Sequence, residues 1–328
     1  MTRKRVLSGM RPTGRLHMGH LFGALDNWRK LQEIYDCFFF IADWHALTTD
    51  YANPANIREF TVEVVLDWLA AGLDPQKATF FVQSRLPEHA ELHLLFSMFT
   101  PLAWLERVPT YKEQQEQITD KDLHTYGFLG YPLLQAADIL IYKAHYVPVG
   151  VDQMPHVELT REVARRFNFL YRDILVEPEA LLTEFPKIPG TDGRKMSKSY
   201  ENAIFLSDTP ETVTAKVKPM ITDPARKRRK DPGNPEVCPV YDLHKVFTPD
   251  AERKDVIVPG CTSAGIGCLD CKEILLKYAL PVLTPVSERR AALAKEPEAV
   301  QAILDDGTAR ARVVARATLS EVKSAMQI

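Results

Sequence analysis

The first half of the chain alternates short apolar segments with amphipathic ones, and this alternation restricts the fold more than any other feature. Residues 4–9, 37–42 and 79–83 are short apolar runs of the kind that buried strands show. Between them, residues 17–34 and 53–72 carry apolar side chains at helical spacing. Strands that alternate with helices form parallel sheets through right-handed crossovers. The sequence therefore predicts an α/β fold, and ligands of such sheets bind beyond the carboxyl ends of the strands.

Capping and helix-terminating residues mark the ends of the second helix, and a change in pattern marks the end of the first domain. Asn53 is suited to cap the second helix, Pro54 to its first turn and Gly72 to its end. After about Asn202 the strand signals fade, and the chain beyond residue 272 is helical in pattern. At 328 residues the chain has the length of two domains. We expect a Rossmann-type parallel sheet over residues 1–200 and an α-helical domain over residues 201–328, whose last helices are free to pack back on the first domain.

The charge and hydropathy of the chain exclude two classes of protein. A formal charge of −2 excludes binding of nucleic acid through bulk positive charge. A local basic run, Arg226–Lys230, is either a solvated loop or a contact to tRNA phosphate, and the sequence favours neither. The longest apolar runs, such as Cys37–Ala42, are too short to span a bilayer, and no apolar signal core follows residues 1–5. We therefore expect a cytoplasmic protein whose cysteines are reduced.

The stretch "SGMRPTGRLHMGH", residues 8–20, has part of the pattern of a phosphate-binding loop. Gly9 and Gly14 have the spacing of a Walker A loop, but Arg15 and Leu16 stand where lysine and a hydroxyl residue should follow. A glycine turn before a helix still offers unpaired backbone N–H groups and the positive end of the helix dipole. His17 and His20 share the first helical turn and are candidate donors to phosphate. The alternative is a pair of surface histidines, and no carboxylate in the pattern completes a metal site.

A second stretch, "PGTDGRKMSKSYEN" at residues 189–202, is a glycine-bearing loop with two lysines. Lys195 and Lys198 are three residues apart. Two ammonium groups on a loop suit a charge that develops only in a transition state, such as that of departing pyrophosphate. A charge run on its own is more often a solvated face.

Taken together, the two stretches resemble the paired signatures "HIGH" and "KMSKS" of class I aminoacyl-tRNA synthetases. The second matches letter for letter, and the first has Met18 where the family usually has isoleucine. Further stretches resemble the bacterial tryptophanyl-tRNA synthetase family over nearly the whole chain: "ADWHALT", "LERVPTYKE", "YPLLQAADILIY", "VPVGVDQ" and "HVELTRE". One departure is Val151, where the family often has glutamate.

The resemblance implies a two-step reaction and a set of site residues. Tryptophan attacks the α-phosphorus of ATP, which is bound with Mg²⁺, and the tryptophanyl group of the adenylate then passes to tRNA(Trp). His17 and His20 are expected at the ATP phosphates, and Lys195 and Lys198 at the leaving pyrophosphate. The expected ATP contacts are Arg11, Pro12, Thr13, Gly19, His20, Gly150, Val151, Asp152, Ile188, Lys195, Met196, Ser197, Lys198 and Ser199. The expected tryptophan contacts are Gly9, His45, Tyr131, Asp138 and Gln153. The family also implies a homodimer, and a helical domain that meets the anticodon.

Asp138 has a physical rationale beside the resemblance. A carboxylate on the apolar helix "LLQAADILI" is costly to bury unless a donor satisfies it. The indole N–H of tryptophan is such a donor, and phenylalanine has none, so a site of this kind can reject the wrong ligand by on the order of 10⁴. The alternative is that Asp138 pairs with an arginine or caps another helix.

Four of the five cysteines have the spacing C-x22-C-x6-C-x2-C: Cys238, Cys261, Cys268 and Cys271. Closed zinc sites are the commonest use of four cysteines, but zinc ribbons show two close pairs. One close pair with two separate thiolates suits a [4Fe–4S] cluster at least as well. The resemblance to a subset of bacterial family members with this spacing favours iron–sulfur, with Zn²⁺ as the alternative. Cys37, inside an aromatic strand, is expected to be a buried core thiol.

Two other functions compete with this interpretation. A tyrosyl-tRNA synthetase has the same fold but needs a second polar group for the phenol, and "ADWHALT" does not fit it. A non-catalytic RNA-binding or iron–sulfur sensor protein should have lost the phosphate-handling residues, whereas both histidines and both lysines are present.

Overall fold

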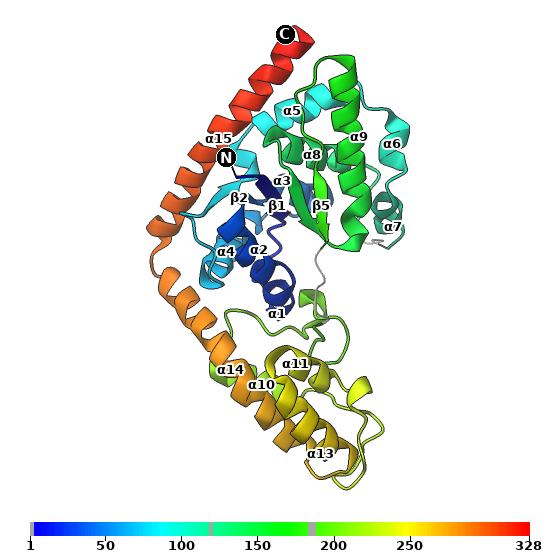
Figure 1. The fold of residues 1–328 in the computed structure, drawn as a ribbon, viewed down its shortest axis with the longest axis vertical. Coiled ribbons are helices and arrows are strands. Elements are labelled where there is room, and N and C mark those ends of the chain that lie inside the picture. The colour runs from blue at the N-terminus through cyan, green and yellow to red at the C-terminus, as the bar shows by residue number, and fades with distance from the viewer. Residues whose placement is uncertain (1–2, 118–120, 183–187) are drawn as a thin grey trace.

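A computed structural model of the chain describes residues 3–117, 121–182 and 188–328 (Figure 1). Its centre is a five-stranded parallel sheet with the strand order β3-β2-β1-β4-β5. The strands are β1 (Arg5–Met10), β2 (Asp36–Ile41), β3 (Ala78–Val82), β4 (Tyr146–Val149) and β5 (Glu179–Leu182). The predicted parallel α/β fold is confirmed, and the first three strands lie within one residue of their expected positions.

The order of the strands fixes where a ligand can bind. From β1 the chain continues to β2 and β3 on one side, and later returns to β4 and β5 on the other side. The connections on the two sides of β1 therefore leave in opposite directions, which opens a crevice at the carboxyl ends of β1 and β4. Gly9 and Met10 end β1, and Val149 ends β4. The glycine turn singled out in the sequence, which contains Gly9 and Gly14, begins at this crevice.

Helices cover both faces of the sheet, because alternate strand residues point to opposite faces. Phe39 and Phe80 belong to one core, which holds Trp68 of α4, and Phe38 and Phe81 belong to the other, which holds Leu140 of α8. The helices up to β5 are α1 (Met18–His20), α2 (Asp26–Ile34), α3 (Asp43–Asp50), α4 (Ile57–Ala70), α5 (Glu88–Ser97), α6 (Leu102–Glu106), α7 (Pro109–Gln117), α8 (Tyr126–Ile141) and α9 (Met154–Leu170).

Two helices differ from their predicted form. The segment 17–34 is helical but is interrupted between α1 and α2 by a π-helical turn, Leu21–Leu25. The helix expected to begin at Asn53 begins instead at Ile57, so the predicted Asn53 cap is wrong. Its first residues form a turn in which the Ile57 N–H donates to the Pro54 carbonyl over 3.1 Å. Gly72 ends the helix as predicted, with a φ of +96° that other residues rarely adopt.

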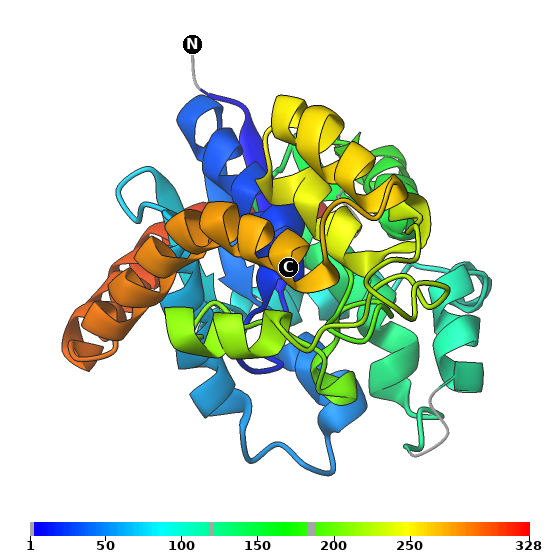
Figure 2. The same ribbon diagram turned by 90° about the horizontal axis from the view of Figure 1, so that it is seen from below.

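The described residues after Asn202 contain helices and no strand. They are α10 (Pro210–Val217), α11 (Pro239–Phe247), α12 (Asp250–Glu252), α13 (Val258–Thr262), α14 (Cys268–Leu293) and α15 (Pro297–Met326). Figure 1 shows α10, α11, α13 and the start of α14 at the end of the molecule opposite the C-terminus, and Figure 2 views the molecule from that end. The last helix, α15, runs back along the sheet and packs on β3 and α5. Among the described residues, no helix is long and apolar enough to cross a membrane.

Candidate active site

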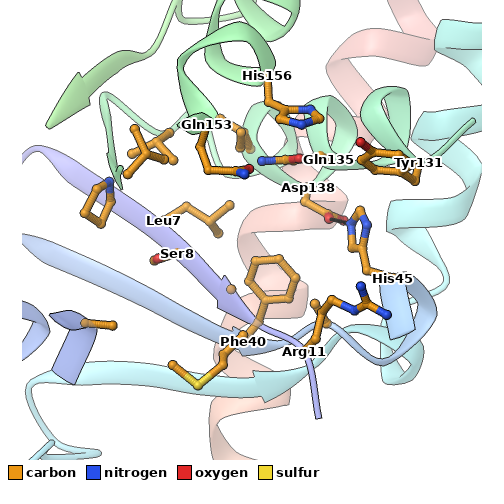
Figure 3. Close-up of a pocket in the computed structure, with 18 of the residues that line it drawn as sticks. Leu7, Ser8, Arg11, Phe40, His45, Tyr131, Gln135, Asp138, Gln153 and His156 are labelled. Carbon is orange, nitrogen blue, oxygen red and sulfur yellow. Dashed lines mark hydrogen bonds and ion pairs between the residues drawn. The ribbon is translucent and has the colours of Figure 1, made fainter. Parts of the chain in front are cut away.

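A cavity of about 400 Å³ lies at the crevice between β1 and β4 (Figure 3). Figure 3 shows Gln153 and His156 on one side of it and Phe40 and Arg11 on the other. Seven of the residues predicted from the sequence line this cavity: Gly9, Arg11, His45, Tyr131, Asp138, Gly150 and Gln153. Gly9 is required by close packing, because a Cβ at this position would lie 2.5 Å from the Phe40 ring. The five predicted tryptophan contacts are thus brought together.

Helix α8 carries three polar side chains into the cavity. Tyr131, Gln135 and Asp138 lie four and three residues apart, so they share one face of the helix. The remaining faces are apolar and buried, which anchors the helix against the sheet. The side-chain hydroxyl of Thr125 caps the first turn by accepting from the Phe128 N–H over 3.2 Å.

The carboxylate of Asp138 is fully buried and accepts hydrogen bonds from three side chains. Gln83 Nε2 lies 2.8 and 2.9 Å from its two oxygens, His89 Nδ1 lies 2.7 Å from Oδ1, and His45 Nε2 lies 2.7 Å from Oδ2. Burial by itself would raise the pKa of Asp138, but the hydrogen bonds from His45 and His89 hold it below its ordinary value. Asp138 is therefore ionised and serves only as an acceptor.

Two of these donors are fixed and the third faces the cavity. The Trp44 N–H donates to Gln83 Oε1 over 3.2 Å, which turns the Gln83 amide nitrogen toward Asp138. His89 is buried, with Nδ1 on Asp138 and Nε2 2.8 Å from the Tyr142 hydroxyl. His45 lines the cavity, and its side chain is 12% exposed. Asp138 lines the same cavity, so an incoming donor can reach its carboxylate beside His45 or in its place.

At the start of α1, His17 and His20 each use one ring nitrogen within the helix turn. His17 Nδ1 accepts from the Gly19 N–H over 3.1 Å, and His20 Nδ1 accepts from the His17 N–H over 3.3 Å. Burial, with the nearby Lys198 and Lys195 charges, lowers the pKa of His17 to about 4, and burial next to His17 lowers the pKa of His20 to about 3. Both rings are therefore neutral, with the proton on Nε2, and are donors for an anion. Gly19 makes room for the His17 ring, because a Cβ at this position would lie 2.9 Å from that ring.

The lysine-bearing loop lies against the glycine turn, although 175 or more residues separate them in the chain. Lys198 Nζ donates to the carbonyls of Thr13 and Gly14, each over 2.9 Å. The segment after the loop contacts the start of α1, since the Met18 N–H donates to the Ile204 carbonyl over 3.0 Å. Lys195 is exposed. Burial lowers the pKa of Lys198 to about 8.

The other predicted ATP residues occupy three places. Pro12 and Thr13 continue the turn from Arg11, and Val151 and Asp152 are exposed in the short 3-10 helix that follows Gly150. Within the lysine loop, Ile188 and Met196 are buried, Ser197 is half-buried and Ser199 is exposed.

A buried ion pair stabilises the stretch that follows the glycine turn. Asp67 of α4 accepts from the Leu16 N–H over 2.6 Å and from Arg290 Nε of α14 over 2.6 Å. Burial raises the pKa of Asp67 to about 6 against the effect of the Arg290 charge, so the carboxyl is ionised at neutral pH. Arg290 also bonds Glu63 over 2.6 Å. The turn, the sheet domain and the long helix α14 are thus tied together at one point.

The model of the family "tRNA synthetases class I (W and Y)" matches residues 2–276. This chain belongs to that family. The tryptophan–tRNA ligase of Thermotoga maritima is 54% identical over 325 residues, which cover 99% of each chain, and that of Ralstonia nicotianae is 48% identical over 98% of each. A crystal structure of tryptophanyl-tRNA synthetase from Campylobacter jejuni complexed with ADP and tryptophan superimposes with a TM-score of 0.89 at 32% identity, over 99% of this chain and 100% of that one.

The four cysteines of this class I synthetase line a second, small cavity. It lies between α11, α13 and α14, with Val240 and Ile266 as apolar neighbours. Arg226 Nη1 lies 4.0 Å from Cys261 Sγ, and His244 Nε2 lies 3.3 Å from Cys271 Sγ. Within the described part of the chain, no three His, Cys, Asp or Glu side chains are close enough together to hold a single metal ion. Cys37 is buried in β2, as predicted.

Sequence reasoning did not find five residues of the synthetase site. Gln83 and His89 contact Asp138, Gln135 and His156 line the cavity, and Thr110 contacts Tyr131. None lies in a motif whose spacing points to chemistry, because each is brought to the site by a different helix. The available signal was that Thr110, Gln135 and His156 lie in the stretches "LERVPTYKE", "YPLLQAADILIY" and "HVELTRE", which carry the family resemblance.

Proposed function

We propose that this chain is a tryptophan–tRNA ligase. It activates L-tryptophan with ATP, giving tryptophanyl-adenylate and pyrophosphate, and transfers the tryptophanyl group to tRNA(Trp) in protein synthesis. The observation that carries the proposal is the buried, ionised Asp138 at the wall of the cavity, in a family whose tryptophan-specific members match the chain from end to end. A cytoplasmic location follows from the activity.

Tryptophan occupies the cavity with its indole N–H donating to Asp138. The ring fills the space between Gly9 and His45, next to the aromatic Phe40. Tyr131 and Gln153, on the same wall, hold the ammonium group. Because the carboxylate of Asp138 is ionised and buried, a ligand without a donor at this position loses a charge-assisted hydrogen bond.

The glycine turn and the lysine loop handle the phosphates. Neutral His17 and His20 donate from Nε2 to phosphate oxygens, and Lys195 and Lys198 neutralise the charge that develops on the pyrophosphate, together with Mg²⁺. The remaining predicted ATP residues shape the nucleotide site: Arg11 to Thr13, Gly19, Gly150 to Asp152, Ile188, Met196, Ser197 and Ser199. The protein forms no covalent bond to the substrate, so positioning and charge stabilisation supply the rate acceleration.

ATP–pyrophosphate exchange measured with each of the twenty amino acids tests the activity. Exchange with tryptophan alone is expected. Exchange that is faster with tyrosine would favour the tyrosyl-tRNA synthetase alternative. The absence of exchange with every amino acid, in folded protein, would favour a non-catalytic RNA-binding protein.

The proposal also assigns a different function to each of two parts of the chain. Residues 1–200 carry the ATP and tryptophan sites, and residues 201–328 carry the cysteines and meet the anticodon of tRNA(Trp). Lys227, Arg228 and Lys230 beside the cysteines are exposed, which suits a phosphate contact but also a solvated loop. Charge reversal at these three positions, read as the salt dependence of tRNA binding, separates the two alternatives.

The four cysteines hold a [4Fe–4S] cluster in this proposal. All four line one cavity, and a cubane cluster binds each of four thiolates to a different iron. The residues that would hold the cluster are Cys238, Cys261, Cys268 and Cys271, and the Arg226 charge beside Cys261 offsets the negative charge of four thiolates. Such a cluster cross-links helices and has the capacity for one-electron transfer.

Purification without oxygen tests the cluster. Brown protein with a broad absorption shoulder near the violet, and with iron and sulfide in equal amounts, is expected. Cys268→Ser should lose the colour, and the matched control Cys37→Ala should keep it. Colourless protein that contains zinc would support the Zn²⁺ alternative.

We also propose a homodimer. Met98 at the end of α5, Leu102 in α6 and Phe169 at the end of α9 are apolar and exposed, at 65%, 57% and 89%. The ends of α5 and α9 are adjacent, because Arg166 Nε donates to the Phe99 carbonyl over 2.8 Å. Sedimentation equilibrium should show a dimer for the natural chain and a monomer for Phe169→Glu. A monomeric natural chain would contradict the proposal.

A further inference from the structure

Behind Tyr131, two side chains from other helices form a short hydrogen-bonded chain. The Tyr131 hydroxyl of α8 lies 3.0 Å from Thr110 Oγ1 of α7, and Thr110 Oγ1 lies 2.7 Å from His156 Nε2 of α9. His156 lines the substrate cavity, and only 2% of it is exposed. Its other ring nitrogen, Nδ1, has no hydrogen-bond partner among the residues that the structure describes. The ring of His156 therefore makes its polar side-chain contact with Thr110.

The chemistry of the substrate limits how Tyr131 can bind it. An ammonium group has N–H donors and no acceptor, so a hydroxyl can bind it only through an oxygen lone pair. Tyr131 keeps its proton, because burial raises the pKa of its phenol. That proton must be donated to another group, or it points at the ammonium and repels it. Among the described contacts of the Tyr131 hydroxyl, Thr110 Oγ1 is the partner at hydrogen-bond distance, and it is able to accept that proton.

We propose that Thr110 and His156 are positioning residues that turn the Tyr131 hydroxyl so that its oxygen accepts a hydrogen bond from the substrate ammonium. The inference rests on the proposed function of the cavity. Because the Tyr131 oxygen accepts from the ammonium, the order of donors follows. Tyr131 O–H donates to Thr110 Oγ1, and Thr110 O–H donates to His156 Nε2. His156 then carries its proton on Nδ1.

Burial supports this order of donors. It lowers the pKa of His156 to about 4, with the nearby His45 contributing in the same direction, so His156 is neutral and one of its two ring nitrogens is an acceptor. In the reverse order His156 would donate to Thr110 and Thr110 to Tyr131. The phenol proton would then point into the cavity, where an ammonium group could not be accepted.

Matched variants of Thr110 test the inference. Thr110→Val keeps the shape and removes the hydroxyl, and Thr110→Ser keeps the hydroxyl. Three ligands separate the groups of the substrate: tryptophan, tryptamine, which lacks the carboxylate, and indole-3-propionate, which lacks the ammonium. Dissociation constants are measured by calorimetry, and circular dichroism confirms that each variant is folded.

Thr110→Val is expected to weaken tryptophan and tryptamine about tenfold and indole-3-propionate less than about twofold. Thr110→Ser is expected to bind all three within about threefold of the natural protein. In a Tyr131→Phe background, Thr110→Val should cause no further loss for tryptophan, because the hydroxyl that it positions is gone.

Equal weakening of all three ligands by Thr110→Val would overturn the inference, since Thr110 would then only shape the cavity. A full further loss in the Tyr131→Phe background would overturn it as well. Both results leave tryptophan binding by the natural protein intact, and so leave the proposed function standing. A natural protein that binds neither tryptophan nor tryptamine would refute the proposed function itself, and the inference with it.

Discussion

Replacing the indole N–H of tryptophan by sulfur tests how this protein selects its amino acid. The analogue β-(3-benzothienyl)alanine has nearly the shape of tryptophan but no donor on the five-membered ring. In the structure, Asp138 is fully buried and ionised, so it has to accept hydrogen bonds. In the proposed binding mode, the analogue places its sulfur where tryptophan places the indole N–H, and so it donates nothing to Asp138.

The size of the penalty follows from the partners that Asp138 keeps. Gln83 and His89 still donate to Oδ1, over 2.8 and 2.7 Å, so one hydrogen bond to a charged group is lost, not the whole set. Such a bond contributes about 2–3 kcal/mol, which is about 30- to 150-fold in kcat/KM. The discrimination is thus smaller than the order of 10⁴ that an otherwise unpaired carboxylate would give.

Asp138→Asn supplies the matched variant. The amide nitrogen takes the place of Oδ1 and donates to His89 Nδ1, and His89 adapts by donating from Nε2 to the Tyr142 hydroxyl, which lies 2.8 Å away. Gln83 keeps only its bond to the amide oxygen, which takes the place of Oδ2. The amide oxygen remains as a neutral acceptor for the indole, so discrimination should fall to about 1 kcal/mol, or about fivefold. ATP–pyrophosphate exchange gives kcat/KM for both amino acids. Equal discrimination by Asp138→Asn and the natural protein, or equal use of both substrates by the natural protein, would refute this account of selectivity.

Three further results follow from packing and charge. Gly307→Ala should destabilise the protein by about 3 kcal/mol, because a Cβ would lie 1.8 Å from the Phe80 carbonyl oxygen. Gly127→Ala, with open space around it, should not destabilise the protein. Urea unfolding of both variants checks this, and similar unfolding midpoints would contradict it. Arg290→Met should cost about 3–5 kcal/mol in the same assay, since it leaves Asp67 as a buried carboxylate without its cation, and a loss below about 1 kcal/mol would show that the pair is dispensable. Lys198 has a pKa of about 8, so its charge is present below that pH and lost above it. The kcat/KM for ATP should therefore fall as pH rises through about 8, and Lys198→Arg should abolish the fall; a fall that persists in that variant belongs to another group.

Much of the architecture could be predicted from local sequence. The strands at 37–42 and 79–83 were visible as apolar runs because both of their faces are buried. The ends of α4 show the limit: Gly72 was found because its positive φ demands glycine, but the start at Ile57 depends on a turn around Pro54 that has no sequence signature. The π-helical turn after His20 was likewise invisible, because it continues the apolar pattern of the helix.

The sequence by itself determined the chemistry that the chain carries: two histidines at a helix start, two lysines on a loop, four spaced cysteines and a carboxylate in an apolar helix. These are properties of residue types and short spacings. Only the tertiary structure decided which of them meet, placing Lys198 on the carbonyls of Thr13 and Gly14 and surrounding Asp138 with Gln83, His89 and His45. The reason is physical: hydrogen-bond partners act over about 3 Å in space, and packing alone brings together residues that the chain keeps far apart.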